Sequence, residues 1–175
     1  MQQIKRIIWI ISIIFISCNT KEQEARQIVK QWLGKEIILP DSLKGSQQDS
    51  LWRNMLNKDF KILTFIDTND CTECRLKLYE WKKHIQSIDS FHSNHSFIFI
   101  VHAKDYHLIE TIKKKNKFNY PIIYDYKNKI GSINQFPPNP HFQTFLLDRN
   151  NKVILIGNPI NNTQLWNLYK QIILE

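Results

Sequence analysis

The residues best suited to chemistry in this chain are two cysteines three positions apart, Cys71 and Cys74. They follow an apolar segment that ends near Asp67, and they open a segment with helical periodicity. A thiolate in the first turn of a helix faces backbone N–H groups without intrahelical partners, which lowers the pKa of a thiol and increases its reactivity. A second thiol one helical turn further on is close enough to resolve a mixed disulfide. The pair is therefore predicted to be a redox-active dithiol.

Two other uses of this cysteine pair stay open. Together with His92 and His95, the cysteines have the residue types of a tetrahedral zinc site. A single helix over residues 72–88 would hold the two groups roughly 25 Å apart, at ~1.5 Å per residue, so we expect no metal site. The other use is a structural disulfide, which an oxidising exterior favours, although a bridge across so short a loop constrains little of the unfolded chain.

The segments around the cysteines alternate between strand and helix patterns. Before them, the pattern predicts a helix over residues 21–33 that ends at Gly34, a strand over 36–39 and a short amphipathic piece over 51–56. The remaining predicted elements are strands over 61–66, 97–101 and 121–124, helices over 72–88 and 106–115, a hairpin of strands 144–147 and 152–156, and a last helix over 163–173. This order predicts one layered α/β domain with a mixed sheet.

Two segments taken together resemble the bacterial thioredoxin-like lipoproteins that are related to redoxins and membrane-tethered thiol reductases. One is Leu63-Thr-Phe-Ile66 before Cys71-Thr-Glu-Cys74, and the other runs from Gln143-Thr-Phe-Leu-Leu through Asp148 to Lys152-Val-Ile. The resemblance covers about residues 36–173. It implies a thioredoxin-like fold, with a mixed central sheet, helices on both faces and an N-terminal extension. It also implies that Cys71 is the attacking thiol and Cys74 the resolving one.

The chain departs from this family at two places. The family carries a cis-proline two residues before the Thr of its Thr-Phe segment, where this chain has Phe142. A non-proline cis bond costs about 3–4 kcal/mol, so we expect a trans bond and an altered substrate groove. The family's buried polar residue six positions before the first cysteine is Phe65 here. His141 is the candidate that replaces it as proton acceptor, because an imidazole can take up a proton near neutral pH.

The first residues have the pattern of an export signal. Lys5 and Arg6 precede an apolar run over residues 7–16, which is too short for a membrane span of roughly 20 residues. The following Ser17-Cys18 resembles a lipobox, which implies lipidation of Cys18. We therefore expect a signal peptide over 1–17, an anchor and helix over 18–35, and a thioredoxin-like domain over 36–175. The expected location is the bacterial cell envelope, lipid-anchored through Cys18 and facing the periplasm or the cell exterior.

Charge and composition exclude several classes of function. The formal charge is +8, but the basic residues are dispersed, and the densest group, at Lys113, Lys114, Lys115 and Lys117, is a solvated helix end. We expect no nucleic-acid partner. The chain has no Gly-rich phosphate loop and no nucleophile elbow, and we expect no cofactor. Four tryptophans are expected in the core: Trp32, Trp52, Trp81 and Trp166.

The sequence is compatible with two functions. The first is a thiol-disulfide oxidoreductase that acts on protein or peptide disulfides through Cys71 and Cys74. The second is a redox-inactive binding module that keeps the fold and holds a protein or peptide in the groove around Phe142. The exposure and activation of Cys71 distinguish them.

Overall fold

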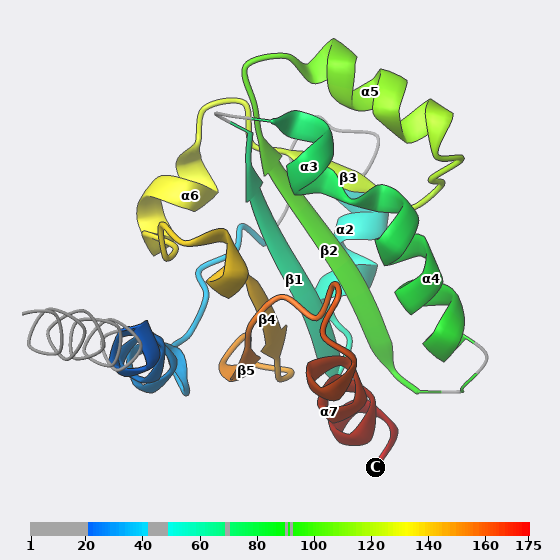
Figure 1. The fold of residues 1–175 in the computed structure, drawn as a ribbon. Coiled ribbons are helices and arrows are strands. Elements are labelled where there is room, and N and C mark those ends of the chain that lie inside the picture. The colour runs from blue at the N-terminus through cyan, green and yellow to red at the C-terminus, as the bar shows by residue number, and fades with distance from the viewer. Residues whose placement is uncertain (1–20, 42–48, 69–70, 90, 92) are drawn as a thin grey trace, which may run out of the picture.

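The centre of the protein is a mixed five-stranded sheet with the order β3-β2-β1-β4-β5 (Figure 1). The structure is a computed structural model, and it describes residues 21–41, 49–68, 71–89, 91 and 93–175. The parallel strands are β1 (Phe60–Asp67), β2 (His95–His102) and β3 (Ile122–Tyr124). β4 (Thr144–Leu147) runs antiparallel to β1, and β5 (Val153–Ile156) runs antiparallel to β4. This confirms the predicted mixed sheet.

Helices cover both faces of this sheet, because alternate side chains of each strand point to opposite faces. Ile62 and Ile66 of β1 belong to one core, while Leu63 and Phe65 belong to the other. The first core is covered by α3 (Thr72–Leu76), α4 (Leu78–Asp89), α5 (Tyr106–Lys115) and α7 (Thr163–Leu174). The second core is covered by α2 (Asp49–Leu56), α6 (Lys129–Asn134) and the helical residues 21–32.

The four tryptophans expected in the core are all buried. Trp81 and Trp166 lie in the first core, and Trp32 and Trp52 lie in the second. Within the described residues, no helix is both long and apolar enough to cross a membrane. The predicted signal peptide and Cys18 lie outside the described residues.

The predicted strand over residues 36–39 is wrong. The segment forms only one isolated bridge, between Glu36 and Lys152 beside β5. The reason lies in the side chain of Asn134, which accepts the Ile38 N–H at 2.8 Å and donates to the Ile38 carbonyl at 2.9 Å. Because a side chain already satisfies these backbone groups, the segment does not continue as a strand.

The single helix predicted over residues 72–88 is also wrong, since Lys77 interrupts it with a left-handed backbone (φ 43°). Leu76 and Leu78 are both buried in the first core. In a continuous helix, side chains two positions apart point in nearly opposite directions. The break at Lys77 lets both leucines face the sheet and gives α3 and α4 separate axes.

Two short elements were not predicted from the sequence. α6 begins after Asn128, and a 3₁₀ turn spans Pro140–Phe142 just before β4. Thr144 pairs with Thr64 in an antiparallel register, so the residues before Thr144 lie toward the end of β1. The turn therefore places His141 and Phe142 at that end of the sheet.

Candidate functional site

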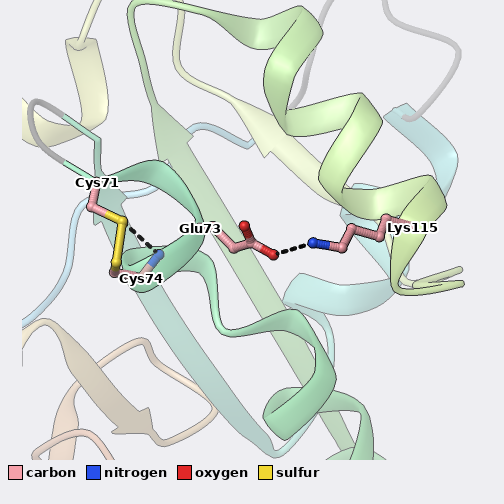
Figure 2. The surroundings of a disulfide bond; sticks show 4 residues. All are labelled: Cys71, Glu73, Cys74 and Lys115. Carbon is pink, nitrogen blue, oxygen red and sulfur yellow. Dashed lines mark hydrogen bonds and ion pairs between the residues drawn. A yellow bond between two sulfur atoms is a disulfide. The ribbon is translucent and has the colours of Figure 1, made fainter.

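Cys71 and Cys74 form a disulfide at the start of α3, beyond the end of β1 (Figure 2). Their Cα atoms are 5.3 Å apart, and both residues are exposed. Cys71 is the N-cap of α3, and its Sγ accepts the backbone N–H of Cys74 at 3.3 Å. An N–H donor directed at a sulfur stabilises a thiolate at that position. The bridge is therefore accessible to another thiol, and a thiolate on Cys71 would be better stabilised than one on Cys74.

The helix that carries the cysteines is only five residues long. Its effect on Cys71 therefore comes from nearby N–H groups rather than from a long helix dipole. α3 is tied to α5 by an ion pair between Glu73 and Lys115, with an N–O distance of 2.9 Å (Figure 2). Both side chains are largely exposed, so this ion pair orients the helix but adds little stability.

A groove of about 360 Å³ opens beside Cys74 and brings His141 to the same surface. The groove runs between α3, the loop before β4 and the segment after β5. Its remaining lining residues are Thr64, Phe65, Ile66, Arg75, Lys77, Pro140, Gln143, Thr144, Asn158, Ile160, Asn161 and Asn162. His141 thus lines the same groove as Cys74, and its role as proton acceptor stays a prediction.

Phe142 does not line this groove. Its side chain is half-buried and packs against the second core. The described residues contain no cis peptide bond, which confirms the expected trans bond at Phe142. Within the 3₁₀ turn the Phe142 N–H donates to the Asn139 carbonyl, and the Asn158 N–H, from the segment after β5, donates to the His141 carbonyl.

Sequence reasoning missed the contact that joins this loop to the cysteine helix. The Arg75 guanidinium donates to Gln143 Oε1 at 2.6 Å, and Gln143 Nε2 donates to the Pro137 carbonyl at 2.8 Å. Gln143 is buried. The only signal in the sequence for a role of Gln143 was that it directly follows Phe142, which stands where the resembled family has a proline. The contact fixes the Arg75 guanidinium in the wall of the groove.

Phe65, which stands where the resembled family has a buried polar residue, belongs to an aromatic cluster. Phe65 is buried and stacks on Phe136, with ring centroids 4.6 Å apart. The acid nearest to it on β1 is Asp67, which lines a second cavity of about 350 Å³ together with Arg75. Asp67 Oδ1 is buried and has no hydrogen-bond partner among the described residues.

The residues of the alternative zinc site do not come together. His95 pairs with Phe60 at the start of β1, whereas the cysteines follow the last residue of that strand. An extended segment of this length spans roughly 23 Å at ~3.3 Å per residue. His95 is therefore too distant to share a metal ion with the cysteines, and His92 lies outside the described residues.

No protein-family model and no curated protein sequence matches this chain. Solved structures do match. The thioredoxin domain of a thiol-disulfide oxidoreductase from Bacteroides vulgatus is 13% identical, with a TM-score of 0.57, over 81% of this chain and 97% of that one.

Two further matches have a similar architecture. A thiol:disulfide interchange protein from Bacteroides sp. is 12% identical, with a TM-score of 0.53, over 69% of this chain and 76% of that one. A thiol:disulfide interchange protein of the thioredoxin family from Chlorobium tepidum is 14% identical, with a TM-score of 0.51, over 69% of this chain and 83% of that one. Identities this low establish the fold alone, and the strand order, the helix placement and these similarities together show that the chain has the thioredoxin fold.

Proposed function

We propose that this chain is a thiol-disulfide oxidoreductase whose redox-active pair is Cys71 and Cys74. The observation that carries the proposal is an exposed disulfide at the start of a helix, with Cys71 Sγ accepting a backbone N–H and a groove opening beside Cys74. A purely structural bridge has no need of an accessible sulfur or an adjacent groove. Solved thiol-disulfide oxidoreductases and interchange proteins with the same fold support this assignment.

The proposed reaction exchanges one disulfide for another. In the reduced protein, the Cys71 thiolate attacks one sulfur of a substrate disulfide, a mixed disulfide forms, and the other substrate sulfur leaves as a thiolate. Cys74 then loses its proton and attacks Cys71 Sγ. This step forms the Cys71–Cys74 disulfide and releases the second substrate thiolate. The dithiol is oxidised by two electrons, the substrate disulfide is reduced by two, and the reverse sequence oxidises a substrate dithiol.

In this scheme His141 accepts the proton of Cys74, because both residues line the groove. The expected effect of His141→Gln is a slower second step with an unchanged first step. Rapid-quench trapping of the mixed disulfide measures both steps. Accumulation of this intermediate in the variant supports the role, whereas unchanged decay excludes it.

The setting of the reaction is the second part of the proposal. We place the protein in the bacterial cell envelope, anchored by lipid on Cys18 after removal of residues 1–17 and facing the periplasm or the cell exterior. The support for this is the charged start, the short apolar run and the Ser17-Cys18 pair. The proposed substrates are protein or peptide disulfides and thiols.

The test is an equilibrium redox titration of the purified full chain in glutathione and dithiothreitol buffers. Alkylation and mass analysis of the peptide that carries residues 71–74 separate this pair from Cys18. We expect a reversible two-electron transition and reduction of insulin disulfides, both lost in Cys71→Ser. A Cys18→Ser variant is the matched control and should retain both. An unreactive pair, or insulin reduction that is unaffected by Cys71→Ser, would leave the redox-inactive binding module as the better description.

A further inference from the structure

The two sides of the Cys71–Cys74 disulfide differ in charge. On one side, a cavity that touches both cysteines is lined by two acids, Glu73 and Glu80, together with Lys77. On the other side lies the groove beside Cys74, and none of the described acidic residues lines it. Its charged and titratable side chains are Arg75, Lys77 and His141. The described charged side chains that line the groove are therefore all cationic, and Asp67 lies in the adjoining cavity that shares Arg75.

The fold fixes the backbone of Lys77 and the guanidinium of Arg75. Lys77 ends α3 in a left-handed conformation, three residues after Cys74, and its side chain borders both cavities. The Arg75 guanidinium is fixed by Gln143, which is itself buried and bonded to Pro137.

The asparagines of the groove add hydrogen-bond donors. Asn158 Oδ1 accepts the Ile160 N–H at 2.9 Å, and Asn162 Oδ1 accepts the Leu165 N–H at 3.0 Å. Because these oxygens already accept backbone N–H groups, the amide NH₂ group is the part of each side chain that can donate. Amide donors and cations are the groups that bind a carboxylate.

We propose that this groove selects peptide disulfides with an acidic residue next to the cysteine. The inference rests on the proposed function and names its substrate class. Cys71 forms the mixed disulfide with the peptide sulfur, and the neighbouring carboxylate lies in the groove against Lys77. Cys74 then displaces the peptide thiolate and takes over the bond to Cys71, so that the dithiol supplies the two electrons. The cations increase the rate of the first attack by attracting the acidic peptide.

The experiment compares peptide disulfides that differ in one residue. Each peptide has the same length and one cysteine joined by a disulfide to 2-mercaptoethanol, and the residue after the cysteine is Glu, Gln or Lys. The exchange rate constant of the reduced full chain is measured at low salt and at about 0.5 M salt, where the screening length is only a few ångströms. We expect the Glu peptide to react about fivefold faster than the Gln peptide, the Lys peptide to react slowest, and the differences to shrink at high salt.

Two charge-matched variants locate the effect. Lys77→Gln should reduce the ratio of the Glu rate to the Gln rate severalfold. Lys152→Gln removes the same charge at the opposite end of the sheet. Lys152 follows the turn after Leu147, which pairs with Lys61 near the start of β1, whereas the cysteines follow Asp67 at the end of that strand. This control should leave the ratio unchanged. Equal rates for all three peptides, or equal losses in both variants, would overturn the inference while the oxidoreductase stands.

Failure of the proposed function has a different signature. If the reduced chain reacts with none of the peptides, the oxidoreductase is excluded. The selectivity of the groove is then measured by equilibrium binding of the oxidised chain to the same peptides with Ser in place of Cys. Tighter binding of the Glu peptide, weakened by Lys77→Gln and not by Lys152→Gln, would support the groove as an acidic-peptide site. Equal binding of the three peptides would contradict it.

Discussion

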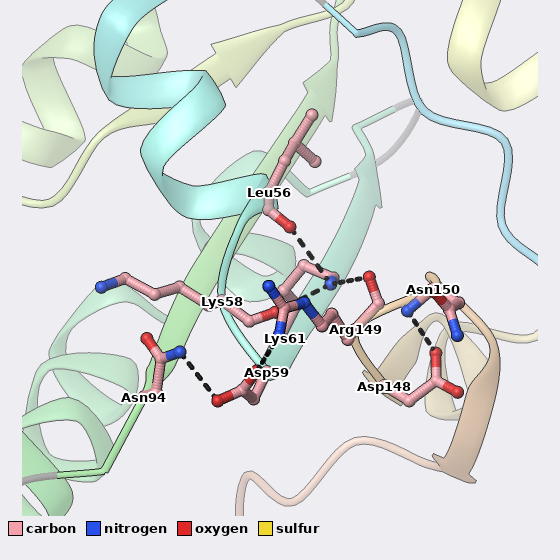
Figure 3. A network of polar contacts seen from close by, with 8 residues as sticks. All are labelled: Leu56, Lys58, Asp59, Lys61, Asn94, Asp148, Arg149 and Asn150. Carbon is pink, nitrogen blue, oxygen red and sulfur yellow. Dashed lines mark hydrogen bonds and ion pairs between the residues drawn. The ribbon is translucent and has the colours of Figure 1, made fainter.

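At the scale of single residues, the least expected feature is a fully buried lysine in β1. Lys61 Nζ donates to the carbonyl oxygens of Leu56, Lys58 and Arg149, at 3.3, 3.1 and 3.1 Å (Figure 3). Burial lowers the pKa of Lys61, and this effect is opposed by the negative charges of Asp148 and Asp59. The ammonium group joins the end of α2 to the turn between β4 and β5, so its role is structural.

Replacement of this lysine by an apolar side chain of similar length should destabilise the fold. In Lys61→Met, three carbonyl oxygens lose their donor while most of the packing is kept. We expect the free energy of unfolding to fall by about 2 kcal/mol, since each unsatisfied buried acceptor costs about 1–3 kcal/mol and part of the cost is offset by removing a buried charge. Urea denaturation measures the change. Lys152→Met, at an exposed position, is the control, and an equal effect in both variants would contradict the structural role of Lys61.

At the scale of elements, the break between α3 and α4 decides how the cysteines sit on the sheet. Lys77 accepts a left-handed backbone so that Leu76 and Leu78 can both be buried. The N–H of Trp81 then donates to the Lys77 carbonyl at 3.1 Å and starts the next helix. The burial of two leucines outweighs the strain of one residue, because each buried side chain contributes about 1.5–3 kcal/mol.

Glycine at this position should relieve the strain. A left-handed conformation costs a residue with a Cβ about 1 kcal/mol relative to glycine. We therefore expect Lys77→Gly to be more stable than Lys77→Ala by about 1 kcal/mol in urea denaturation, because both variants remove the same charge and only one removes the Cβ. Equal stability of the two variants would show that the break is not strained.

At the scale of the whole molecule, the two cores are closed by different segments of the chain. The first core is sealed where α4 meets α7, through His84 and Trp166, whose ring centroids are 4.3 Å apart. Burial lowers the pKa of His84, partly offset by a hydrogen bond with the backbone of Pro159, and the charge of Lys170 lowers it further. His95 has a lowered pKa for the same main reason, its burial.

These half-buried histidines make the fold sensitive to mild acid. A histidine whose pKa is lower in the folded chain binds its proton more readily after unfolding, so protonation favours the unfolded state. We expect the free energy of unfolding to fall as the pH decreases from about 7 to roughly 5, through the ordinary histidine pKa of about 6.5. His84→Phe keeps an aromatic ring against Trp166 and should show a smaller decrease. Urea denaturation at several pH values measures this, and an unchanged pH dependence in His84→Phe would exclude the contribution of His84.

The sequence by itself determined the α/β order, the mixed sheet and the position of the cysteine pair at the end of a strand. The bounds of α5 and β4 agree with the predicted ranges, because hydrophobic periodicity and the chemistry of turns are local properties of the chain. Among the site residues, Cys71, Cys74 and His141 were named from sequence, and their catalytic roles stay predictions.

The tertiary structure alone decided what surrounds the cysteines. Arg75 and Gln143 meet across 68 positions of sequence, and the asparagines after β5 reach the same groove. These contacts exist because β4 pairs with β1 and β5 pairs with β4, which brings the loop before β4 and the segment after β5 to the end of the sheet that carries the cysteines. The break at Lys77 likewise depends on two leucines that share one core. No local pattern encodes such juxtapositions, since their free energy comes from packing between segments distant in sequence.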